Sequence, residues 1–149
     1  MREELKQRLL RLVNFLEIEL RDYSKFRQIT QAEYREDRDK NRNVERWVEN
    51  IINSSVDISK VILTYEGKSL PDNYKEIVLS LSLVKDLGIG DAEALSYWVK
   101  FRNIISHEYL DIRWVSIKKF IAETEPLYRD LLDKVKIYLE KQIVEGKEE

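Results

Sequence analysis

The sequence predicts an all-α protein, an antiparallel bundle of about five to six helices. Apolar residues recur every three to four positions over long stretches, which is the period of an amphipathic helix. Glycine occurs four times and proline twice in 149 residues, so few positions break a helix. The breaks cluster at residues 67–71, at residues 88–90 and near Pro126. With 43% apolar residues, the chain can bury a core as a single domain over residues 1–149.

The first half of the chain is expected to form helices with two breaks. An apolar stripe at helical spacing comprises Leu5, Leu9, Val13, Leu16 and Leu20. Thr30 and Glu33 have the spacing of a capping box, which starts a second helical stretch. The charged run 35–46 mostly forms a solvated face and is expected to hold a kink or short break. A long core-facing stripe follows between Val44 and Ile62.

The next helix is expected over residues 74–87. Asp72 or Asn73 can cap its start, and Gly88 ends it. Residues 77–84 alternate between apolar and polar side chains, as in a strand. A lone strand would have no partner in this sequence, so we expect a buried helix there.

Two further helices complete the bundle. Asp91 caps one that we extend to His107, and the last runs from about Asp111 to the C-terminus, bent at Pro126. The tail, residues 146–149, is expected to fray.

Composition excludes several kinds of site. The chain has no cysteine, and His107 is its only histidine, so we expect no metal ion or other cofactor. No stretch approaches the roughly 20 apolar residues of a membrane span, and the acidic, amphipathic N-terminus does not resemble a signal peptide. We therefore expect a cytoplasmic protein that does not bind membranes.

Charge argues against nucleic-acid binding by the whole surface but permits a local basic site. Charged residues make up 36% of the chain, and the net charge is −2, which is typical of a solvated helical surface. Residues 100–119 differ, because this segment contains five positive side chains and only two negative ones.

Arg102 occupies an unusual position on the helix that we expect from Asp91 to His107. On a helical wheel it lies in the middle of the apolar arc, between Leu95 and Trp98. Burying an unpaired charge costs several kcal/mol. Three explanations stay open: a snorkelling or carboxylate-paired structural arginine, a subunit interface, or an anion-binding cleft suited to phosphate.

The neighbours of His107 make it a candidate catalytic residue. Tyr109 follows it, and Asn103 precedes it by about one turn with an amide that can support it or a substrate. Ser106 can only support, because no second histidine exists to activate it as a nucleophile. On a straight helix Arg102 and His107 lie about 140° apart. Either the helix ends before His107, or a dimer completes the site, and we favour the dimer.

Arg102-x4-His107-x-Tyr109 resembles the Arg-x4-His-x-Tyr motif of the HepT family of HEPN-domain toxins. The likeness extends over roughly residues 40–142. It includes three further segments, Phe101-Arg102-Asn103, Pro71-Asp72-Asn73-Tyr74 and Asp111-Ile112-Arg113-Trp114, and the later Pro126-Leu127. The resemblance implies a HEPN-type antiparallel bundle that works as a homodimer.

The same resemblance implies a metal-independent endoribonuclease toxin whose target is tRNA or mRNA. Arg102 would bind the scissile phosphate, and two copies of His107 at the dimer cleft would act as base and acid. An antitoxin of the minimal nucleotidyltransferase (MNT) type would transfer AMP to Tyr109 and silence the cleft.

Two alternatives remain. Related HEPN proteins are substrate-binding partners of minimal nucleotidyltransferases without nuclease activity, in which case Arg102 is only a phosphate clamp. The second alternative is a plain helical dimerisation module, which the central position of Arg102 disfavours.

Overall fold

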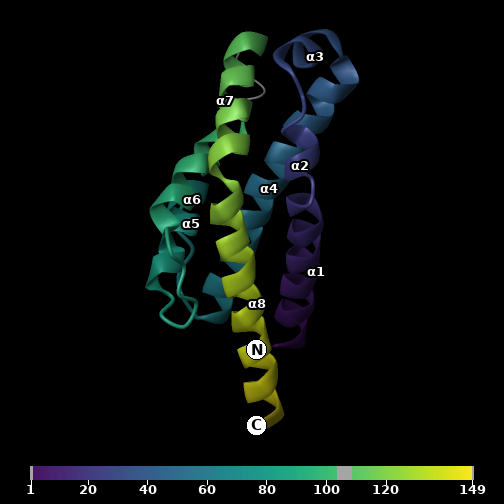
Figure 1. Cartoon of the computed structure of the whole chain (residues 1–149). Helices are drawn as coiled ribbons and strands as arrows, with labels where there is room; N and C mark the ends of the chain where they lie inside the picture. Colours follow the sequence, from purple (N-terminus) through teal and green to yellow (C-terminus); the bar gives the residue numbers. More distant parts are fainter. Residues whose placement is uncertain (1, 104–108, 149) are drawn as a thin grey trace.

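The computed structural model describes residues 2–103 and 109–148, with side chains to residue 143. Every regular element within these ranges is helical, so the expected all-α class is confirmed. The long helices are α1 (Glu3–Leu20), α4 (Arg38–Tyr65) and α8 (Glu125–Glu148). Figure 1 shows α1 running antiparallel to both α4 and α8, with α5 and α6 on the opposite side of α8 from α1.

The predicted apolar stripes of α1 and α4 form the core of the bundle. Four of the five stripe residues of α1 are buried, namely Leu9, Val13, Leu16 and Leu20, and Leu5 is partly buried. α4 is buried on more than one face, because α1, α5, α6 and α7 all pack against it. Each fully buried aliphatic side chain contributes about 1.5–3 kcal/mol relative to an exposed one.

The capping signals of the first half are confirmed in α3 (Gln31–Glu36). The amide N–H of Glu33 donates to the Thr30 hydroxyl at 3.1 Å, and the amide N–H of Thr30 donates to the Glu33 carboxylate at 3.2 Å. The expected break in the charged run falls at Asp37, whose carboxylate accepts from the amide N–H of Asp39 at 3.0 Å and so caps α4. The short α2 (Tyr23–Phe26) was not anticipated.

The helix expected over residues 74–87 is shorter than predicted. α5 (Tyr74–Leu79) starts at Asn73, whose amide oxygen accepts from the Glu76 N–H at 2.9 Å. The chain then continues as the 3-10 helix η1 (Ser80–Leu83). The Ser80 hydroxyl donates to the carbonyl of Glu76 at 2.8 Å. Hydroxyls that bond back to helix carbonyls slightly weaken a regular helix, although Ser54, Ser55 and Ser59 make such bonds inside the unbroken α4.

The helix expected from Asp91 to His107 also ends early. Asp91 caps α6 (Ala92–Val99) as predicted, but the chain continues as the 3-10 helix η2 (Lys100–Arg102). At Asn103 the backbone has left the helix, with φ −114° and ψ 3°. The wheel that separates Arg102 from His107 by about 140° therefore does not apply.

The last expected helix is two helices, α7 (Leu110–Glu123) and α8, separated at Thr124. Pro126 lies in the first turn of α8. Because proline has no backbone N–H, it cannot donate to a carbonyl in the last turn of α7, and it is tolerated at the start of a new helix. Figure 1 shows α7 and α8 following one another along the length of the bundle. No helix within the described residues is both long enough and apolar enough to span a membrane.

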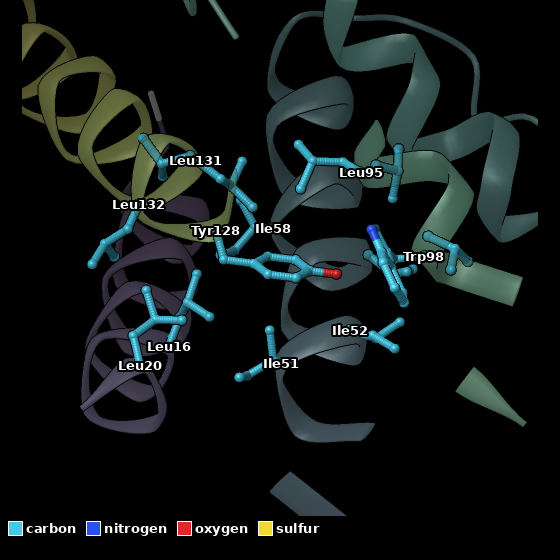
Figure 2. Close-up of a cluster of buried hydrophobic side chains, with 14 of the residues drawn as sticks. Leu16, Leu20, Ile51, Ile52, Ile58, Leu95, Trp98, Tyr128, Leu131 and Leu132 are labelled. Atoms are coloured by element: carbon cyan, nitrogen blue, oxygen red, sulfur yellow. The ribbon is translucent and has the colours of Figure 1, made fainter. Parts of the chain in front are cut away.

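An aromatic core ties η2 to the bundle. Figure 2 shows Tyr128 of α8 reaching across the core toward Trp98 of α6, between Ile58 and Ile52 of α4. Trp98 packs edge-on against Phe120 at 5.6 Å between ring centroids. The ring centroid of Phe101 lies 4.9 Å from that of Trp98. Phe101 is buried and belongs to η2, so the ring contacts fix the backbone that carries Arg102.

Candidate functional site

Arg102 is held by side chains from two other helices. Its Nε donates a hydrogen bond to the amide oxygen of Asn53 on α4, at 2.7 Å. Its guanidinium carbon lies 4.1 Å from the centroid of the Tyr74 ring at the start of α5. The bond uses Nε, and within the described residues the two terminal nitrogens have no hydrogen-bond partner.

The Tyr74 ring contacts a second cationic side chain. The Nζ atom of Lys60, on α4, lies 4.7 Å from the centroid of the same ring. Tyr74 is 37% exposed, so the ring is reached by solvent as well as by both cations. Each cation–π contact contributes about 0.5–1 kcal/mol at an exposed site.

These contacts bear on the first explanation offered for Arg102, a structural arginine paired to a carboxylate. None of the ion pairs between described residues includes Arg102, and its partners are a neutral amide and a neutral ring. A structural arginine paired to a carboxylate is therefore not what the described part of the chain shows. Within the described residues, Asn53 and Tyr74 orient the partly buried guanidinium without neutralising its charge, an arrangement that is compatible with an anion-binding cleft.

The remaining motif residues are placed unequally. Asn103 is exposed and directly follows η2. Tyr109 is the N-cap of α7 and is 85% exposed. His107 and Ser106 lie outside the described residues, so their predicted roles as catalytic and supporting residues stay predictions.

The start of α7, and with it Tyr109, is anchored by ion pairs. Arg35 of α3 donates to the Asp111 carboxylate through Nε at 3.0 Å and Nη2 at 2.8 Å. Two residues after Asp111, Arg113 pairs with the buried Glu45 of α4 at 3.3 Å. Burial raises the pKa of Glu45, although the hydrogen bond from Tyr34 and the charge of Arg113 act in the opposite direction. The exposed hydroxyl of Tyr109 is thus presented from a fixed helix end.

A hollow at a different place on the surface does not suit RNA. Its volume is about 500 Å³, and it lies along the first half of α4. Two arginines and three carboxylates line it, together with Asn43: Asp39, Arg42, Glu45, Arg46 and Glu49. The carboxylates would repel phosphate, so the hollow adds nothing to the site at Arg102.

Sequence reasoning did not identify Asn53 and Lys60 as functional residues. Asn53 directly follows Ile51 and Ile52, two residues of the core stripe of α4, and is partly buried. Its polar amide beside this stripe is the feature by which the sequence could have indicated it. Lys60 is seven residues later, close to two helical turns, and so lies on the same face of α4. Tyr74 was recognised only as part of the Pro71–Tyr74 segment.

The geometry defines an all-helical protein with an oriented arginine in a short 3-10 helix and an exposed tyrosine at the start of the next helix. The family model described as "Ribonuclease HepT-like" matches residues 16–135. The chain therefore belongs to the HepT-like ribonuclease family, and the sequence-based assignment to it is confirmed. A comparison with curated proteins gives no match.

Proposed function

We propose that this protein is a metal-independent endoribonuclease that acts as the toxin of a toxin–antitoxin pair. The observation that carries the proposal is Arg102, whose charge is oriented by Asn53 and Tyr74 but not neutralised by them. A phosphate supplies the missing negative charge and accepts from the guanidinium fork. The pentacoordinate transition state carries more negative charge than the substrate, so Arg102 stabilises it further.

The motif histidine supplies the proton transfers. One His107 takes the proton from the ribose 2′-hydroxyl, and the 2′-oxygen attacks phosphorus. The bond from phosphorus to the 5′-oxygen then breaks, and the leaving oxygen takes a proton from a second, protonated His107. One chain has a single histidine, so the second copy comes from a homodimer. The products are a 2′,3′-cyclic phosphate and a 5′-hydroxyl.

Exposed apolar side chains beside the motif support the homodimer. Ile112 is 51% exposed and Val115 is 66% exposed, and the two are three residues apart on α7, so they are neighbours on its surface. A second copy on this face of α7 would cover the apolar side chains and bring two motifs together. Val115→Lys should shift the sedimentation coefficient toward that of the monomer and reduce cleavage in parallel. A dimer that persists with Val115→Lys and Ile112→Lys combined would place the interface elsewhere.

Tyr109 is the proposed target of a minimal nucleotidyltransferase antitoxin. Its 85% exposure leaves the hydroxyl accessible to a second enzyme. Transfer of AMP would place a phosphate near Arg102 and repel RNA. Coexpression with the adjacent transferase should add one or more AMP masses to the wild-type chain and none to Tyr109→Phe. An equal mass gain in both proteins would rule out Tyr109 as the acceptor.

Paired substitutions test the nuclease. Arg102→Ala and His107→Ala should each abolish RNA cleavage while leaving the helical circular dichroism spectrum and a cooperative melting transition in place. Arg11→Ala, which removes an exposed arginine of α1, is the matched control and should cleave at the wild-type rate. Full cleavage by both motif variants would refute the assignment. Wild-type protein that binds RNA without cutting it would instead favour the non-catalytic partner of a nucleotidyltransferase.

A further inference from the structure

Two lysines from different elements converge on one tyrosine near the motif. Tyr97 lies on α6 and is 38% exposed. The Nζ of Lys100, in η2, lies 3.8 Å from the centroid of the Tyr97 ring, and the Nζ of Lys119, on α7, lies 5.7 Å from it. Lys100 belongs to the same short helix as Arg102. We call Tyr97, Lys100 and Lys119 the lysine–tyrosine cluster.

The positive charge of the lysine–tyrosine cluster is not neutralised within the described residues. No ion pair found there includes Lys100 or Lys119, whereas Lys136 pairs with a glutamate at 2.6 Å. The hydrogen bond and charge of Lys100, with the charge of Lys119, hold the pKa of Tyr97 below its ordinary value against a smaller opposing effect of burial. Both lysines are exposed, so a ligand can reach them.

The tyrosine is fixed before any ligand binds. Its ring packs edge-on against Trp98 at 5.3 Å between centroids and lies 5.8 Å from the ring of Phe101. Both neighbours are buried in the aromatic core. Because the rigid ring already holds both ammonium groups, the two lysines lose less conformational entropy when they bind an anion.

We propose that the lysine–tyrosine cluster binds a backbone phosphate of the substrate RNA that flanks the scissile phosphate. The proposal deepens the proposed nuclease function and rests on it. Lys100 and Lys119 neutralise the phosphate, and Tyr97 positions both ammonium groups. Lys100 and Arg102 are two residues apart in η2, so one rigid segment contacts two phosphates of one strand. Contacts of this kind fix the register of a strand without reading its sequence.

Salt dependence of RNA binding tests the cluster. The probe is a single-stranded RNA with a 2′-O-methyl group on every ribose, which binds but cannot be cleaved. Each neutralised phosphate contributes about 0.7 to the slope of log Kd against log salt for a single strand. Because both lysines contact the same phosphate, Lys100→Ala and Lys119→Ala should lower the slope by about 0.7 when combined, and each alone should lower it by less. Tyr97→Ala should weaken binding in low salt, and Tyr97→Phe should weaken it less because the ring stays.

Lys25→Ala is the matched control. Lys25 is exposed on α2, and its Nζ lies 5.1 Å from the Phe26 ring, so it is also a lysine held by an aromatic ring. Its removal should leave the slope unchanged. An unchanged slope in the double variant, or the same loss in Lys25→Ala, would overturn the proposal.

Failure of the cluster and failure of the nuclease are distinguishable. Wild-type cleavage of unmodified RNA together with an unchanged slope in the lysine variants would refute the cluster and keep the nuclease. Lysine-dependent binding without any cleavage would refute the nuclease and keep the cluster. Neither binding nor cleavage would refute both.

Discussion

Replacing Asn53 by aspartate should silence the protein without harming its fold. Asn53 accepts a hydrogen bond from Arg102 at 2.7 Å, so a carboxylate of nearly the same shape would form an ion pair with the guanidinium. At about 4 Å and an effective dielectric constant of about 20, opposite unit charges attract by about 4 kcal/mol. RNA phosphate must compete with this attraction. Because each 1.36 kcal/mol is about tenfold in rate, Asn53→Asp should slow cleavage by about 10³-fold.

Asn53→Ala separates positioning from charge. The alanine removes a charge-assisted hydrogen bond of about 1.5–3 kcal/mol but leaves Arg102 unpaired and stacked on Tyr74. Cleavage should therefore fall by about 10-fold to 100-fold, less than in Asn53→Asp. Single-turnover cleavage of a labelled RNA gives both rates, and thermal melting checks the fold.

The control for added charge is Asn43→Asp, an exposed position on the same helix. It changes the net charge equally and should leave cleavage near the wild-type rate. Wild-type cleavage by Asn53→Asp would show that phosphate does not use the charge of Arg102, and the reasoning behind the site would fail.

Three further predictions concern stability, each measured by urea denaturation. The Tyr128 hydroxyl is fully buried and has no hydrogen-bond partner among the described residues, so Tyr128→Phe should raise the free energy of unfolding by about 1 kcal/mol; a loss of that size would contradict the description of the core. Gly67 ends α4 with φ 71°, where a Cβ is strained, and Gly67→Ala should cost about 1 kcal/mol, whereas no loss would mean that the turn adapts. Partial burial raises the pKa of Glu125, but hydrogen bonds and charges of Arg27 and Arg129 outweigh it and lower the pKa overall. Since the folded pKa lies below the unfolded one, the ionised form stabilises the fold above a pH of about 4, and this contribution is lost as the pH falls further. Glu125→Gln should therefore cost about 1 kcal/mol at pH 7 and progressively less below pH ~4, and a constant difference would rule out the ion pairs as its source.

The helical architecture was predictable because its signals are local. The stripe on α1, the capping box at Thr30 and the break near Asp37 each depend on residues a few positions apart. The ends of α5 and α6 were missed for a different reason. Serine hydroxyls bond to helix carbonyls around the end of α5, and buried aromatic rings pack around Phe101 where α6 gives way to η2. Periodicity reports neither effect.

The site was only partly predictable for the same reason. The motif spacing identified Arg102 and Tyr109, and the wheel showed that Arg102 needed an explanation. Its partners, Asn53 and Tyr74, are 49 and 28 residues away along the chain, and only the packing of α4 and α5 against η2 brings them to the guanidinium.

Cleavage of RNA by the purified protein in EDTA tests the central claim most directly. A chain whose catalysis depends on Arg102 and His107 needs no divalent ion, so cutting should persist in EDTA. The new ends should be a 2′,3′-cyclic phosphate and a 5′-hydroxyl, identified by mass spectrometry, and Arg102→Ala should produce neither. Cleavage that stops in EDTA, or that leaves a 5′-phosphate, would contradict the mechanism built on these residues.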